Sequence, residues 1–127
     1  RICAYLDAQL EPLFAVMDRH WPTALVGSAG SFDTLAELVA SDRSTPISSG
    51  ELTLTFNALE FDVIKESLIG STRAERASIK AIPDHRVDTL PLALIAIERV
   101  LALGIEELRW SRYALKEGAA ARLLFGR

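Results

Sequence analysis

Cysteine, histidine and long apolar runs are all scarce in this chain of 127 residues. The single cysteine, Cys3, cannot form an internal disulfide, which favours a reducing, cytoplasmic setting over a secreted one. The two histidines have no partner at metal-ligand spacing, which argues against a zinc site. The longest apolar run, residues 90–97, falls short of the ~20 residues that cross a bilayer. We therefore expect a soluble protein with no membrane partner.

Neither sign of charge dominates the chain. Its 14 basic and 17 acidic residues give a net charge of -3, which offers no electrostatic reason to expect nucleic acid as a partner. Half of the residues are hydrophobic, which suffices to build one core. A chain of 127 residues is too short to form a second one. The chain opens at Arg1 inside an apolar periodic segment, without a methionine. We therefore expect residues 1–127 to form a single partial domain of a longer protein.

Apolar periodicity and turn residues predict an α/β fold with short parallel strands, packed helices and right-handed crossovers. Pro12 should kink or restart the first helix, and Thr72 with Glu75 should form a capping box. Asp84 should cap the last long helix, with Pro91 in its first turn or at a fresh start. The predicted strands cover residues 23–26, 51–55 and 108–111, and the predicted helices include residues 2–17, 33–40, 58–68, 84–103 and 113–124.

A glycine loop, Gly27-Ser28-Ala29-Gly30-Ser31, joins the first predicted strand to a predicted helix. Glycine permits backbone angles that other residues avoid, and amides at a helix N-terminus attract anions. Phosphate-handling loops are built in this way, although many such turns carry glycine only to turn tightly. Ser28 and Ser31 are candidate hydroxyl donors to a ligand. The competing interpretation is that the two serines cap the helix, and for Ser31 we favour it.

Four separated segments share the order and spacing of one enzyme group. They are residues 26–31 with 34–36, residues 75–76 with 86–88, residues 104–105, and residue 111 with 115–118. With these segments the chain resembles the second half of the exopolyphosphatase/guanosine pentaphosphate phosphohydrolase (Ppx/GppA) family, from about Ala24 to the C-terminus. Ala29 departs from the family pattern, because it replaces the middle glycine of the loop and narrows the allowed backbone angles.

The resemblance implies an actin-like, ribonuclease H-like fold of two lobes around a cleft, with this chain as most of the second lobe. Family members remove terminal phosphate from polyphosphate or guanosine pentaphosphate, using a glutamate of the first lobe as general base together with magnesium. The resemblance places those catalytic residues and the magnesium ligands upstream of this chain, so none is assigned here. The phosphate-binding or nucleotide-binding residues it implies are Gly27, Ser28, Ala29, Gly30, Ser31 and Arg86.

Arg86 is the side chain that we expect to contact the anion, because a guanidinium can hold two phosphate oxygens at once. The alternative is a surface pair with Asp84 or Asp88. In the terminal helix, residues 116–118 should lock the helix to the sheet, and Glu117 could pair with Arg112 or Arg122. Trp21 and Trp110 are interpreted as core or rim residues.

Two functions of different class remain open. The chain is either one cleft wall of a phosphohydrolase, inactive by itself, or a non-catalytic lobe that senses a phosphorylated nucleotide or partner. A sugar-kinase or chaperone lobe of the same fold is a more distant alternative. The expected partners are the phosphate substrate, the missing first lobe of the same protein, and a second copy in a homodimer.

Overall fold

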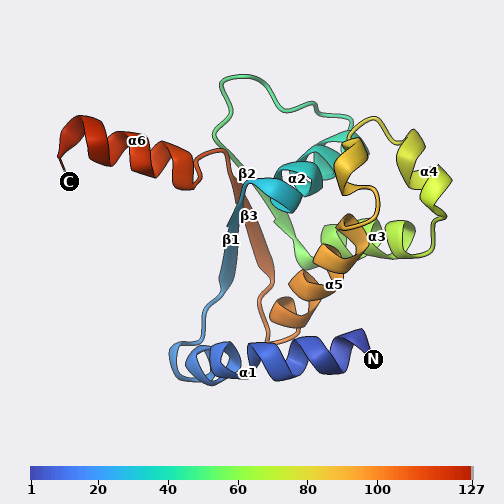
Figure 1. The fold of residues 1–127 in the computed structure, drawn as a ribbon, viewed down its shortest axis with the longest axis horizontal. Coiled ribbons are helices and arrows are strands. Elements are labelled where there is room, and N and C mark those ends of the chain that lie inside the picture. Colours follow the sequence, from blue (N-terminus) through green and yellow to red (C-terminus); the bar gives the residue numbers. More distant parts are fainter. Residues whose placement is uncertain (127) are drawn as a thin grey trace.

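The computed structural model describes residues 1–126, which form a three-stranded sheet with six α-helices (Figure 1). The central strand β3 (Glu107–Ser111) lies between β1 (Ala24–Ser28) and β2 (Thr53–Asn57). β1 and β3 run parallel, whereas β2 runs antiparallel to β3. The prediction of parallel strands is therefore correct for β1 and β3 and wrong for β2. The segment before β2 returns the chain to the edge where β1 and β3 end, so β2 has to run the other way (Figure 1).

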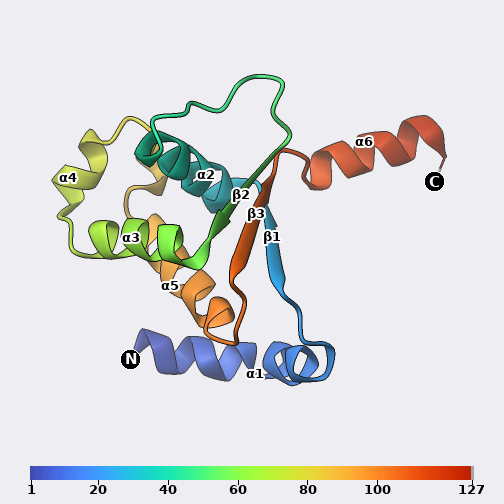
Figure 2. The same cartoon turned by 180° about the vertical axis from the view of Figure 1, so that it is seen from behind.

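Three helices cover one face of the sheet: α2 (Gly30–Asp42), α3 (Ala58–Ile69) and α5 (Leu90–Leu101) (Figures 1 and 2). The short α4 (Arg73–Ser78) and a 3-10 turn, η1 (Asp84–Arg86), connect α3 to α5. None of the helices within residues 1–126 is long and apolar enough to cross a membrane.

The two remaining helices lie at the ends of the chain. α1 (Ile2–His20) packs beside α5, and the ion pair between Arg99 and Asp7 joins these two helices. α1 runs as one helix with Pro12 inside it, so the predicted restart at Pro12 is not observed. α6 (Leu115–Phe125) projects away from the body (Figures 1 and 2).

The helix boundaries follow local signals in most places. The predicted capping box forms, with the Glu75 amide donating to Thr72 Oγ1 at 3.2 Å and the Thr72 amide donating to Glu75 Oε2 at 2.6 Å. Pro91 lies in the first turn of α5, which starts afresh at Leu90, so the fresh start is the one of the two predicted alternatives that is observed. Asp84 does not cap this helix, because it begins η1 instead, and Thr89 occupies the N-cap of α5. The residues from Asp84 to Thr89 therefore lie outside α5, because η1 takes up the start of this segment.

The core fills the space between the sheet and the three covering helices. Leu108 of β3 and Phe61 of α3 are fully buried. A charged residue is also buried there: Lys65 of α3 is 6% exposed, and its Nζ lies 2.6 Å from Glu98 of α5. This pair satisfies the ammonium and joins the two helices. The largest fully buried side chains are Leu35, Val39, Phe61, Val87, Leu90, Leu94 and Leu108.

Candidate functional site

The loop of residues 27–31 lies at the edge of the sheet where the two parallel strands end. Ser28 is the last residue of β1 and is paired with Ser111, the last residue of β3. α2 begins two residues later, at Gly30. Ligands of α/β proteins commonly bind at the carboxyl ends of parallel strands, where helix N-termini supply amide groups. The structure therefore places the loop where an anion could be held.

Two residues of the loop have left-handed backbone angles. Ala29 has φ 59° and ψ 177°, a region that glycine occupies far more easily than alanine, and Gly30 has φ 48°. The Ala29 carbonyl accepts hydrogen bonds from the amides of Phe32, at 3.0 Å, and Asp33, at 3.3 Å. The helix start thus holds Ala29 in a backbone conformation that glycine adopts more easily, and the alanine is strained there.

Gly27 is required by space. It is buried, and a Cβ atom built on it would overlap the ring of Phe32. The ring therefore packs directly on the backbone of β1, where only a residue without a side chain fits. This close approach fixes the first turn of α2 against the end of β1.

Arg86 reaches the loop from η1. Its Nη1 lies 3.5 Å from the Ser31 hydroxyl oxygen, and both guanidinium Nη atoms lie 3.4 Å from the position of a Cβ on Gly30. The alternative surface pairing is not observed. Asp88 pairs with Arg73 at 3.0 Å, and no carboxylate of the described residues forms a salt bridge with Arg86. The half-buried guanidinium therefore keeps donors free for a ligand.

Neither serine caps the helix, so the cap predicted for Ser31 is wrong. The N-cap of α2 is Ala29, and no side chain of the described residues caps this helix. Ser31 lies inside the first turn, where its hydroxyl faces Arg86 instead. The exposed Ser28 ends the strand. The amides of Phe32 and Asp33 already donate to the Ala29 carbonyl, so the amides of Gly30 and Ser31 are the ones of this turn that remain available to an external acceptor.

A contact that the sequence interpretation missed supports the same turn. Asp33, in the first turn of α2, accepts a hydrogen bond of 2.8 Å from the indole Nε1 of Trp110. Trp110 is 5% exposed and lies beside Gly27 in the sheet, which confirms it as a core residue. The acidic Asp33 near a helix start could have been noticed in the sequence, but its partner Trp110 could not, because the two residues are 77 positions apart. The carboxylate is thereby turned toward the sheet.

Comparison with solved structures shows what this arrangement is similar to. An exopolyphosphatase from Cytophaga hutchinsonii is 32% identical, with a TM-score of 0.92 over 98% of this chain and 41% of that one. The resemblance to the Ppx/GppA family is confirmed. Two further structures share the fold. The Aquifex aeolicus member of the Ppx/GppA family is 16% identical, with a TM-score of 0.79 over 99% of this chain and 40% of that one. An exopolyphosphatase-like protein is 20% identical, with a TM-score of 0.78 over 96% of this chain and 41% of that one. The chain thus spans about two-fifths of their length. No protein-family model and no curated protein matches it.

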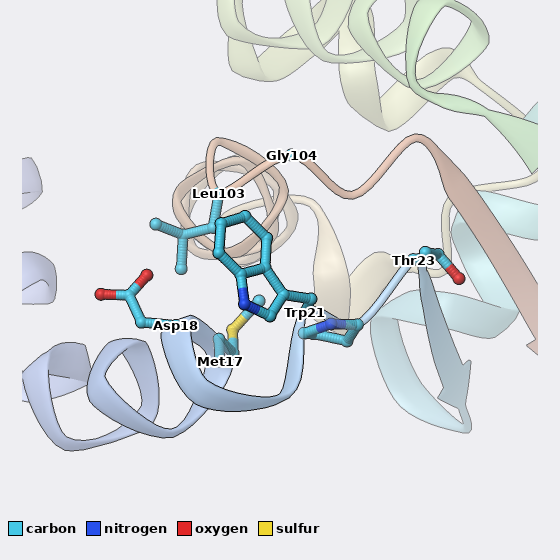
Figure 3. Close-up of a pocket in the computed structure, with 7 residues that line it drawn as sticks. Met17, Asp18, Trp21, Thr23, Leu103 and Gly104 are labelled. Atoms are coloured by element: carbon cyan, nitrogen blue, oxygen red, sulfur yellow. The ribbon is translucent and has the colours of Figure 1, made fainter.

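A pocket of about 250 Å³ lies elsewhere on this Ppx/GppA-like chain (Figure 3). Met17 and Trp21 line it from the end of α1, and Leu103 and Gly104 line it from the segment after α5. Trp21 is 81% exposed, so it is a rim residue and not a core residue. The pocket lies near the N-terminal end of β1, whereas the loop of residues 27–31 lies at the C-terminal end of this strand. It is therefore separate from the candidate anion site.

The residues of the Ppx/GppA-like loop do not fit a magnesium ion. Amides and a guanidinium can only donate hydrogen bonds, which suits an anion. The serine hydroxyl oxygens could bind a metal but carry no charge, whereas protein Mg²⁺ sites usually include one or two carboxylates. The neighbouring carboxylate of Asp33 already accepts from Trp110. Residues 1–126 contain no group of three His, Cys, Asp or Glu side chains that could hold a metal.

The terminal helix differs from what the family resemblance implied. Glu117 accepts from the amide of Ala114 at 2.7 Å and lies 3.5 Å from Lys116. The pairing of Glu117 with Arg112 or Arg122 is therefore not formed. α6 is not locked to the sheet, and it exposes its apolar side chains, with exposures of 75 to 89% at Leu115, Leu123, Leu124 and Phe125.

Proposed function

We propose that this chain forms one wall of the phosphate-binding cleft of a phosphohydrolase with a two-lobed, actin-like fold. The enzyme would release terminal phosphate from inorganic polyphosphate or guanosine pentaphosphate. The observation that carries the proposal is the approach of Arg86 to Ser31 and Gly30 at the start of α2. The structural similarity to an exopolyphosphatase supports the same substrate class.

The proposed role of these residues is to bind and neutralise phosphate. Arg86 would hold two oxygens with its planar fork, and the first amides of α2 would donate to a third. The Ser28 and Ser31 hydroxyls would add donors without adding charge. A phosphate chain held in this way is fixed in position while negative charge develops at the reacting phosphorus.

The proton acceptor and the metal would come from outside this chain. Asp33 is the acidic side chain next to the loop, and it is engaged by Trp110. We therefore propose that the first lobe of the same protein supplies the general base and the ligands of Mg²⁺, which would shield the phosphate charge when bound. The exposed apolar residues of α6 support a contact with that lobe, and a second copy of the chain is the alternative partner.

The test is a comparison of steady-state constants in the longer protein that would carry this chain. Replacing Arg86 by alanine should raise KM for polyphosphate or guanosine pentaphosphate about tenfold, the value of one charge-assisted hydrogen bond. Arg73→Ala, which removes an exposed arginine of α4, is the matched control. An unchanged KM for both substrates in Arg86→Ala would contradict the assignment.

A non-catalytic sensor is the second candidate function. It is favoured by one observation: the site offers anion donors, while its neighbouring carboxylate is occupied. Both candidates predict that the 127-residue chain binds tripolyphosphate and releases no phosphate from it. The two separate in the longer protein, which should hydrolyse guanosine pentaphosphate or polyphosphate only if the first candidate is correct.

A further inference from the structure

The turn that carries Arg86 is held by a second arginine, Arg76. Arg76 Nε donates to the carbonyl of Val87 at 2.9 Å, and its Nη1 donates to the carbonyl of Ser71 at 2.7 Å. Nη1 also lies 3.4 Å from the Ser71 hydroxyl oxygen. One half-buried guanidinium therefore joins the end of α3 to the residue that follows Arg86.

The turn has little support of its own. η1 is three residues long, with a 2.8 Å hydrogen bond from the Arg86 amide to Pro83 and a 3.4 Å bond from the Val87 amide to Asp84. The side chain of Val87 is 1% exposed and is anchored in the core. Its carbonyl is held by Arg76. Because Val87 is fixed at both its side chain and its carbonyl, the backbone from which the preceding Arg86 side chain starts is restrained as well.

We infer that Arg76 is a positioning residue, which aims Arg86 at the loop and does not itself contact the ligand. This inference rests on the proposed phosphate-binding role of Arg86. Its chemical basis is the planar fork of arginine, which can hold two carbonyls in fixed directions, whereas the single ammonium of lysine cannot. The observed donors of Arg76 are taken by the carbonyls of Ser71 and Val87.

Arg73 provides a matched control on the same helix. It pairs with Asp88, which also follows Arg86, but the two side chains are 65% and 64% exposed. Exposed ion pairs contribute little because water and salt screen them. Arg73→Ala removes the same charge as Arg76→Ala, without removing a half-buried contact to the backbone of the turn.

The experiment is a double-mutant cycle on the full 127-residue chain, with tripolyphosphate as the probe and calorimetry as the measurement. Arg86→Ala should weaken binding about tenfold, and Arg76→Ala should weaken it about fivefold, since each removes or misdirects charge-assisted donors. The double variant should match Arg86→Ala, because Arg76 acts only through Arg86. Arg73→Ala should stay within about twofold of the unchanged chain.

The outcomes separate the two hypotheses. If Arg86→Ala binds as the unchanged chain does, the proposed function fails. If Arg86→Ala weakens binding and Arg76→Ala does not, or if the two losses add in the double variant, the positioning role of Arg76 is overturned. Should Arg76→Ala fail to fold, Arg76→Lys decides, because it keeps the charge but not the fork. If Arg76→Lys weakens tripolyphosphate binding about threefold, and has no further effect in a chain that also carries Arg86→Ala, the inference is supported. If Arg76→Lys leaves the affinity unchanged, the inference is overturned.

Discussion

Arg86 and Ser31 are 55 residues apart in the chain, and the guanidinium of the first meets the hydroxyl of the second at 3.5 Å. The contact joins the turn before α5 to the first turn of α2. It brings together two of the segments on which the family resemblance depends. The arginine and the glycine loop therefore form one surface, although each was proposed from a separate part of the sequence.

The packing of Phe32 on Gly27 predicts a strict requirement for glycine. Gly27→Ala places a methyl group within the ring of Phe32, so the ring or β1 has to move. Such overpacking should lower the free energy of unfolding by about 1–3 kcal/mol, measured by urea denaturation. Gly118→Ala is the control, because no atom lies within 4 Å of its added methyl group. A Gly27→Ala chain as stable as the control would contradict the packing.

The strained backbone of Ala29 predicts a stabilising substitution. Ala29→Gly removes the steric cost of φ 59° and ψ 177°, at some cost in the entropy of the unfolded chain. The balance should raise the free energy of unfolding by about 1 kcal/mol. Ala8→Gly, at an exposed site within α1, should instead lower it by about 1 kcal/mol. If both substitutions are destabilising, Ala29 is not strained.

The ion pair of Glu60 and Arg43 predicts a loss of stability in acid. The hydrogen bonds from Arg43, at 2.6 and 2.8 Å, lower the pKa of Glu60, as does the amide of Asn57. Glu60 therefore binds a proton more readily in the unfolded chain than in the folded one. The contribution of the ion pair to the free energy of unfolding is complete above the ordinary glutamate pKa, and it is lost as the pH falls through the lower pKa of Glu60 in the folded chain.

Glu60→Gln should consequently flatten the decline in the free energy of unfolding between about pH 5 and pH 3. Urea denaturation at a series of pH values measures this slope. Glu51→Gln, which changes an exposed glutamate of the preceding loop, should leave the slope unchanged. An equal slope in the Glu60→Gln chain and the unchanged chain would show that the pair does not contribute.

The hydrogen bond between Asp33 and Trp110 predicts a graded response. Asp33→Ala leaves the buried indole donor without its acceptor, which should cost about 1–2 kcal/mol. Asp33→Asn keeps an acceptor oxygen and should cost less. Asp42→Ala, at the other end of α2, is the control. Urea denaturation followed by tryptophan fluorescence measures all three, and equal stability of the Asp33→Ala and control chains would contradict the contact.

Local signals predicted most elements of the fold. Glycines, prolines and capping residues act on their immediate neighbours, so the Thr72–Glu75 box and the end of α3 near Gly70 could be read directly from the sequence. The antiparallel direction of β2 could not, because it depends on where a long loop returns to the sheet. The projection of α6 could not be predicted either, because no local pattern encodes whether a helix packs against the rest of the chain (Figure 1).

The candidate site could be predicted in part. The loop was proposed from its glycines and its place before a helix, and Arg86 was proposed through the family resemblance. The contact between them supports both proposals. The cap predicted for Ser31 was wrong because Ala29 takes the cap position with an unusual backbone. The partners Trp110 of Asp33 and Val87 of Arg76 were missed, since each pair forms only when distant or irregular segments fold together.

The most direct test of the phosphate-binding role is a titration of the isotopically labelled chain with tripolyphosphate, followed by amide and arginine side-chain NMR signals. We predict concentration-dependent shifts at residues 27–31 and at the Nε–H of Arg86, with the amide shifts strongly reduced in Arg86→Ala. Shifts confined to the pocket of Met17 and Trp21, or unaffected by Arg86→Ala, would contradict the account.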